Sequence, residues 1–172
     1  MSQEKVKETI ESDRIRRVWI GDPCYVISEK LWDSVCEQSF PGNNVEGNVI
    51  EFTIQELGNA GMESVHADLP LKYLQCSTMY GDGEYSSYTG FDYGVDSGCL
   101  GIVPDYLIAP DKYGDAHKLG KFLAVNGSIT LETDGNGEFI FTNNGKLIET
   151  ITTAYEENEY YDEYEEHMEY EE

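Results

Sequence analysis

Glycines divide the central part of the chain into short apolar segments, and this spacing most limits the folds open to it. Residues 71–103 carry Tyr, Val and Ile between glycines at positions 81, 83, 90, 94, 98 and 101. Short apolar runs bounded by Gly and Asp are typical of antiparallel hairpins, whereas a helix needs a longer uninterrupted run. We therefore predict hairpin structure here, with turns at Gly81-Asp82-Gly83 and Asp96-Ser97-Gly98.

A second hairpin is predicted nearer the C-terminus. The β-branched run 128–131 and the aromatic run 139–141 flank the turn Asp134-Gly135-Asn136-Gly137. Four residues rich in Gly and Asn between two apolar runs favour a tight reversal of the chain. One more strand is predicted over roughly residues 146–153.

One amphipathic helix stands out near the start of the chain. A strand over residues 15–20 should end at Gly21-Asp22-Pro23, because proline cannot donate a ladder hydrogen bond. Ser28 is a suitable N-cap for a helix over roughly residues 29–40. Its apolar side chains share one face: Leu31, Trp32, Val35 and Cys36. We expect this face to pack with Trp19 and Tyr25, since the connection between strand and helix is short.

These segments predict an α+β, strand-rich fold. We expect a compact antiparallel sheet, either a sandwich or a partly open barrel, with one main helix after the first strand and an acidic C-terminal tail. Three parts follow: an N-terminal polar helix over residues 1–13, a single β-rich domain over 14–155 and the tail over 156–172. A further strand is predicted from Val49, Ile50, Phe52 and Ile54.

The charge of the chain excludes several kinds of partner. There are 34 Asp and Glu residues against 11 Lys and Arg, which gives a formal net charge of −23. Direct binding to nucleic acid or to anionic lipid depends on clustered Lys and Arg, so neither is expected. We also expect no signal peptide and no membrane span, because the sequence lacks the apolar runs that these need. A cytoplasmic protein is the resulting expectation.

The cysteines and histidines do not form a recognisable catalytic or zinc motif. Four cysteines are scattered along the chain: Cys24, Cys36, Cys76 and Cys99. Without CxxC or Cys-x-His spacing, we interpret them as reduced thiols. A hydrolase could use Cys24, Ser97 or Cys99 as nucleophile with His66 or His117 as base, but no GxSxG elbow is present. We assign no catalytic residue and favour a non-enzymatic protein.

Three segments of the chain are similar to segments found in other proteins. They are WIGDPCYVI at 19–27, YGDGEYSSY at 80–88 and YGVDSGCLGIVP at 93–104. In this order they resemble a group of small uncharacterised bacteriophage proteins and, more distantly, a bacterial domain of unknown function with DP, GxY and VDSG elements. The resemblance covers residues 19–104. It implies a compact β-rich domain from a phage or another mobile element, and it assigns no catalytic role.

Three aspartates lie at glycine-rich turns inside these segments: Asp22, Asp82 and Asp96. If the three turns meet, their carboxylates could hold Ca²⁺ or Mg²⁺, since both ions prefer oxygen ligands. The alternative is that each aspartate accepts hydrogen bonds from the backbone of its own turn, which is the commoner use of Asp in turns. No other cofactor is predicted.

The acidic C-terminal tail is the remaining sequence feature that bears on function. Residues 156–172 hold ten carboxylates and no Lys or Arg, which leaves a charge of −13 on residues 1–155. As a helix, the tail would present one carboxylate per roughly 2.5 Å, approaching the roughly 1.7 Å charge spacing of duplex DNA. The alternative is a solubilising extension. The predicted partner-binding residues are Glu156, Glu157, Glu159, Tyr160, Asp162, Glu163, Tyr164, Glu165, Glu166 and Met168.

Two functions of different classes remain open from the sequence. The first is a non-enzymatic acidic protein, a phage accessory or counter-defence factor that engages a basic, nucleic-acid-handling host protein through charge attraction. The second is a small-ligand or divalent-metal domain that sequesters or hydrolyses a phosphorylated molecule through Asp22, Asp82 and Asp96. A structural protein with neither activity is a third possibility.

Overall fold

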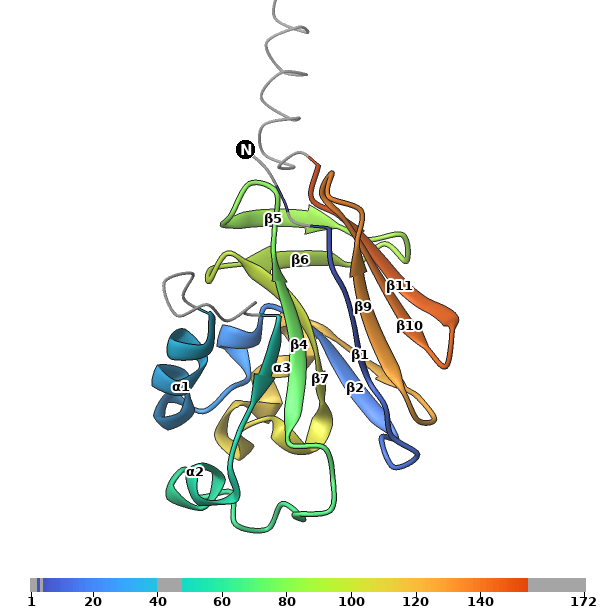
Figure 1. Ribbon diagram of the computed structural model, residues 1–172. Coiled ribbons are helices and arrows are strands. Elements are labelled where there is room, and N and C mark those ends of the chain that lie inside the picture. The colour runs from blue at the N-terminus through green and yellow to red at the C-terminus, as the bar shows by residue number, and fades with distance from the viewer. Residues whose placement is uncertain (1–2, 4, 40–47, 155–172) are drawn as a thin grey trace, which may run out of the picture.

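A computed structural model describes residues 3, 5–39 and 48–154. A four-stranded antiparallel sheet has the order β1-β9-β10-β11 (Figure 1). Its strands are β1 (Lys7–Ile10), β9 (Ile129–Thr133), β10 (Glu138–Asn143) and β11 (Lys146–Thr152). The β9–β10 hairpin closes as predicted, because Asp134 Oδ1 accepts the amide hydrogens of Asn136 at 2.7 Å and Glu138 at 3.1 Å.

A five-stranded antiparallel sheet has the order β3-β4-β7-β2-β8, and two further strands pair only with each other as the β5–β6 hairpin. The larger sheet contains β2 (Arg17–Gly21), β3 (Val49–Glu51), β4 (Lys72–Ser77), β7 (Cys99–Pro104) and β8 (Lys121–Ala124). The hairpin consists of β5 (Gly83–Ser86) and β6 (Asp92–Val95). It lies across the ends of the two larger sheets, at the top of Figure 1.

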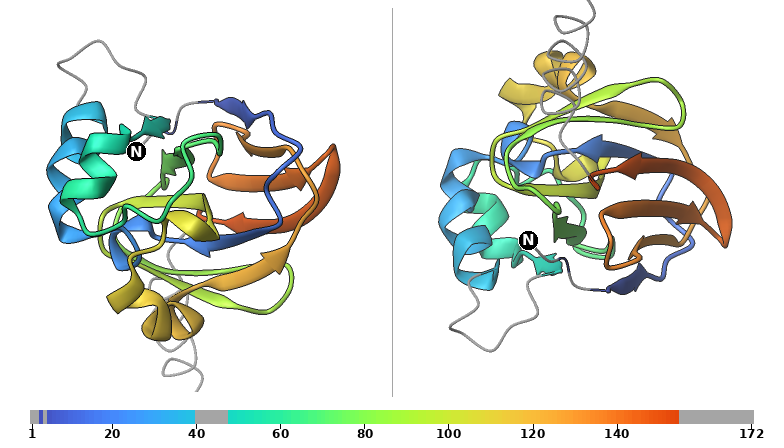
Figure 2. Two further views of the ribbon diagram at one scale, coloured as in Figure 1. Left: turned by 90° about the horizontal axis from the view of Figure 1, so that it is seen from below. Right: turned by 90° about the horizontal axis from the view of Figure 1, so that it is seen from above.

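Helices cover the face of the five-stranded sheet that is turned away from the four-stranded sheet (Figure 2). The α-helices are α1 (Glu29–Ser39), α2 (Ile54–Asn59) and α3 (Tyr113–Leu119). Three short 3₁₀ turns connect other elements: η1 (Pro23–Tyr25), η3 (Asp105–Leu107) and η4 (Pro110–Lys112). The result is a strand-rich α+β fold without a closed barrel among the described residues, which confirms the predicted fold class.

The five-stranded sheet separates two apolar clusters, because side chains alternate between its faces. On β2, Val18 and Ile20 point into the cluster shared with the four-stranded sheet and the β5–β6 hairpin. Trp19, between them, points into the cluster beneath the helices. The predicted packing of the helix on the strand is confirmed, since Val35 is buried there and Tyr25 and Trp32 pack against the same cluster.

The segment 72–104 forms one long bent hairpin. Strands β4 and β7 pair with Leu74 opposite Ile102, and beyond a break β5 and β6 pair with Gly83 opposite Val95. The break consists of residues 78–82 and 96–98, where the two predicted turns lie. The prediction that these segments close hairpins is wrong. They are the two sides of a bend, and the chain reverses at residues 87–91.

Two local predictions are corrected. The helix predicted over residues 1–13 is wrong for Lys7–Ile10, which form β1 and pair with β9. An alternating pattern with Val6, Ile10 and no other apolar side chain suits a strand whose partner supplies the hydrogen bonds. The strand predicted through Ile54 ends at Glu51, because Thr53 caps α2 in a capping box with Glu56. Because Lys7–Ile10 form an additional strand, the main helix α1 follows the second strand, β2, and not the first strand as predicted.

Candidate functional site

The Asp22 side chain links two of the three segments that carry the bacteriophage resemblance, residues 19–27 and 93–104. β2 ends at Gly21, and Asp22 caps η1 by accepting the Cys24 amide hydrogen on Oδ1 at 2.9 Å. Its other oxygen, Oδ2, accepts the backbone amides of Asp96 and Ser97, each at 2.7 Å. The Ser97 hydroxyl donates to Oδ1 at 2.6 Å. The side chain of Asp22 is thus fully buried, with four donors around its two oxygens.

Tyr25 covers the same junction from the outside. Its phenol donates to Asp96 Oδ2, and a Cβ atom on Gly94 would lie 3.6 Å from the phenol oxygen. Partial burial and the acceptor at Asp96 both raise the pKa of Tyr25 above its ordinary value. The phenol therefore remains a donor at neutral pH, and it links the 22–25 segment to the 94–97 segment a second time.

The three aspartates predicted as metal ligands do not converge as one cage. Asp82 lies at the same bend, since a Cβ atom on Gly98 would be 3.9 Å from its Oδ1. However, no group of three His, Cys, Asp or Glu side chains suited to a metal ion occurs among residues 3, 5–39 and 48–154. Asp22 already accepts four hydrogen bonds, which leaves its oxygens little capacity for a cation. The structure uses Asp22 as a backbone acceptor, the alternative weighed from the sequence.

The two candidate cysteine nucleophiles lack the activation that catalysis needs. Burial, together with the Asp22 carboxylate, raises the pKa of Cys24, and burial raises the pKa of Cys99 to about 12. Both thiols therefore stay protonated at neutral pH, the opposite of a reactive cysteine. His117 instead packs against the ring of Phe122 on α3 and β8, with centroids 4.6 Å apart. All four cysteines are free thiols.

A second buried carboxylate, Glu149 on β11, holds the other end of the β5–β6 hairpin. Its Oε2 accepts hydrogen bonds from the Tyr93 phenol and the Thr89 hydroxyl, each at 2.8 Å. Its Oε1 accepts the amide of Thr150 at 3.0 Å. Sequence reasoning did not identify Glu149, because a glutamate in a strand gives no local signal that its partners lie some sixty residues away.

The outer face of the β5–β6 hairpin is acidic. Tyr85 and Tyr93 lie opposite each other and are buried, so the intervening positions face outward. Glu84 and Asp92 are exposed on that side, and Asp82 and Asp96 are exposed at the bend. Residues 73–111 contain no Lys or Arg. The absence of Lys and Arg from this stretch is visible in the sequence, and it is the signal that could have predicted an acidic face here.

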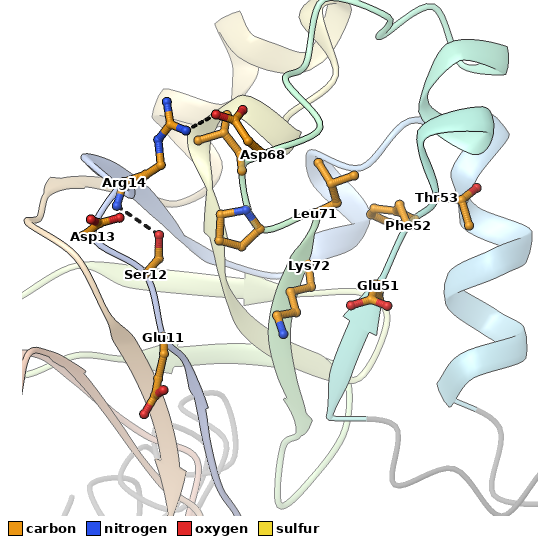
Figure 3. A pocket seen from close by; sticks show the side chains of 12 residues that line it. Glu11, Ser12, Asp13, Arg14, Glu51, Phe52, Thr53, Asp68, Leu71 and Lys72 are labelled. Carbon is orange, nitrogen blue, oxygen red and sulfur yellow. Dashed lines mark hydrogen bonds and ion pairs between the residues drawn. The ribbon is translucent and has the colours of Figure 1, made fainter.

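An open pocket of about 660 Å³ lies on another part of the surface. It is formed by the β1–β2 connection, β3 and the loop before β4, and Figure 3 shows Arg14 reaching across it to Asp68. Arg14 and Asp68 form an ion pair, while Glu51 and Lys72 lie opposite each other in the β3–β4 register. This pocket contains none of the predicted site residues and no nucleophile–base pair.

The predicted partner-binding residues of the tail, from Glu156 to Met168, lie outside the described residues. The last described strand nevertheless ends beside the acidic bend. Thr153 Oγ1 accepts the amide hydrogen of Met79 at 3.1 Å, and Met79 belongs to the 78–82 side of the bend. The chain therefore enters residues 155–172 from the end of the molecule where the hairpin lies.

Comparison with known proteins gives no relative: no protein-family model, no curated protein and no solved structure matches the chain. Within the part of the chain that the structure describes, none of the helices has the length and apolar character to cross a membrane.

Proposed function

We propose that this protein is a non-enzymatic acidic binding protein that engages a basic, nucleic-acid-handling host protein in the host cytoplasm. The observation that carries the proposal is the acidic outer face of the β5–β6 hairpin, which lies within a stretch of 39 residues, 73–111, without Lys or Arg. With the bacteriophage resemblance of residues 19–104, this points to a phage accessory or counter-defence factor.

The hairpin is suited to binding because the backbone that carries its carboxylates is held in place. Glu84 and Asp92 extend from paired strands, and Asp22 and Glu149 hold the two ends of the hairpin. A fixed acidic face loses little conformational entropy on binding, and its charge accelerates encounter with a basic surface. The ten carboxylates of residues 156–172 add to the negative charge that attracts a basic surface.

The alternative, a metal-dependent domain acting on a phosphorylated molecule, has less support. Its three aspartates do not form a group able to hold a metal ion in the described part of the chain. The two oxygens of Asp22 are also occupied by four protein donors.

Affinity capture followed by a charge-matched comparison tests the proposal. The full chain would be used to capture proteins from bacterial lysate, and the affinity of each purified partner would be measured against salt and against duplex DNA. The double variant Glu84→Gln/Asp92→Asn removes two charges from the hairpin. Glu29→Gln/Asp33→Asn removes two exposed charges from α1 as a matched control.

We expect a basic partner whose affinity falls steeply as salt rises, since surface charges are screened over about 8 Å at physiological ionic strength. Duplex DNA should compete, and the hairpin variant should bind more weakly than the α1 control. Deletion of residues 156–172 should also lower the affinity. A partner that binds equally well at high salt, or that DNA does not displace, would overturn the proposal.

A further inference from the structure

Tyr88 is an exposed aromatic side chain at the tip of the β5–β6 hairpin. It is 86% exposed, far more than the other large apolar residues with open surfaces, Leu147 at 52% and Ile54 at 47%. Burying a tyrosine is favourable, and tyrosine is enriched among the residues that dominate protein interfaces. An aromatic ring held this far into solvent is therefore a candidate contact for a partner.

The backbone that carries Tyr88 is firmly held, although its side chain is free. Its amide donates to the Thr150 carbonyl of β11 at 2.9 Å, and the amide of Ser87 donates to the Phe91 carbonyl at 3.0 Å. The neighbouring Thr89 hydroxyl donates to the buried Glu149. The tip is thus pre-organised, so a ligand of Tyr88 would not have to order the loop on binding.

Tyr88 lies on the same hairpin as exposed acidic side chains. Glu84 and Ser86 occupy alternate positions on β5 and project to its outer side, and Tyr88 follows in the turn after β5. Asp92 lies opposite Ser86 in the register and accepts its hydroxyl hydrogen at 3.1 Å. Tyr88 thus lies in the turn that immediately precedes Asp92, the first residue of β6.

An exposed aromatic ring on an acidic hairpin suits the guanidinium group of arginine. Arginine stacks on aromatic faces and forms paired hydrogen bonds with carboxylates, whereas the ammonium of lysine is a compact, strongly hydrated charge. We infer that the β5–β6 hairpin is a docking site for an arginine-containing segment of a basic partner, with the exposed Tyr88 ring as the stacking surface and the exposed carboxylates of Glu84 and Asp92 as acceptors. This inference rests on the proposed function and names the residue chemistry that it recognises.

Titration of the full-length protein with octa-arginine and octa-lysine peptides, followed by amide NMR and calorimetry, tests the inference. Octa-arginine should shift the amides of residues 84–92. Tyr88→Ala should weaken octa-arginine binding about twofold to fivefold, the range expected for an exposed cation–π contact. Tyr88→Phe keeps the ring and should restore the affinity. Leu147→Ala removes another exposed apolar side chain and should leave it unchanged. Octa-lysine should be affected less by Tyr88→Ala.

The outcomes separate this inference from the function on which it rests. If octa-arginine binds the Tyr88→Ala variant as tightly as wild type, and binding is lost only when residues 156–172 are deleted, the inference is wrong while the acidic binding function stands. If neither peptide binds wild-type protein at low salt, both are wrong.

Discussion

The two ends of the β5–β6 hairpin are each held by a buried carboxylate, but in different ways. At the open end, Asp22 accepts three backbone amides and one hydroxyl. Near the tip, Glu149 accepts two hydroxyls and the amide of the residue that follows it. Amides have fixed directions, whereas hydroxyls can rotate toward another acceptor. The open end is therefore the junction at which loss of the carboxylate is harder to compensate.

Neither carboxylate has a cation as partner among the described residues, where the ion pair within 4 Å joins Arg14 and Asp68. A buried charge without a counterion depends on hydrogen-bond donors for its stability. The hairpin therefore owes its position to neutral donors that are spread over distant segments of the chain. We therefore expect that removing an acceptor oxygen lowers the free energy of unfolding more at Asp22 than at Glu149.

The largest effect is expected for Asp22→Asn. The new amide group would direct N–H bonds at the amides of Asp96, Ser97 or Cys24, and at least one donor would lose its acceptor. We expect the free energy of unfolding in urea to fall by about 3 kcal/mol. Asp82→Asn, at the same bend but exposed, should change it by less than about 0.5 kcal/mol. A loss below about 1 kcal/mol for Asp22→Asn would contradict the role given to this junction.

A smaller loss is expected for Glu149→Gln. The glutamine oxygen can still accept from the Tyr93 and Thr89 hydroxyls, so only the contact with the Thr150 amide is disturbed. We expect a cost of about 1 kcal/mol in the same unfolding measurement, with the exposed change Glu84→Gln as control. If Glu149→Gln cost as much as Asp22→Asn, the two junctions would be equivalent and the comparison would fail.

Alkaline pH should weaken both junctions through their tyrosines. Burial raises the pKa of Tyr25 at the open end and of Tyr93 near the tip, with Asp96 and Glu149 respectively adding to the effect. A raised pKa means that the stabilisation is complete below the ordinary tyrosine pKa of about 10 and declines above it. The free energy of unfolding should therefore fall as pH rises past that value. Tyr25→Phe and Tyr93→Phe should each reduce this slope, because each removes one phenol that the folded state keeps protonated; an unchanged slope in both variants would contradict the account.

The smallest effect is expected from divalent ions. Because the Asp22 oxygens are occupied by protein donors, millimolar Ca²⁺ or Mg²⁺ should leave the melting temperature unchanged apart from general salt screening, which NaCl of equal ionic strength measures. A specific rise that Asp96→Asn abolishes would instead support a metal site at the bend, by mass action on the folded state.

The sequence predicted the features that depend on neighbouring residues. The strand before Pro23, helix α1 after Ser28 and the turn at Asp134 each follow from local hydrogen bonds or from the period of the apolar positions. The chain segments that bend at Gly81 and Gly98 were also identified, and both glycines have positive φ, 76° and 81°.

The sequence could not predict features that depend on distant partners. Strand β1 exists because β9 lies beside it, more than 100 residues later, and Asp22 meets Ser97 across 75 positions. The three turn aspartates share a chemistry that suggested a metal, because the partners of Asp22, three backbone amides and a hydroxyl, leave no trace in a residue pattern. Glu149 was missed for the same reason.

Native-state hydrogen exchange tests most directly whether the β5–β6 hairpin is a fixed platform. The Ser97 amide reports on the Asp22 end and the Tyr88 amide on the tip, while the amides of Trp19 and Ile102 in the central sheet serve as the reference. If the hairpin is fixed at both ends, Ser97 and Tyr88 should open at free energies within about 2 kcal/mol of the reference, with Ser97 the better protected. If both amides exchange through openings near zero free energy while the central sheet stays protected, the hairpin is a mobile flap and the account is wrong.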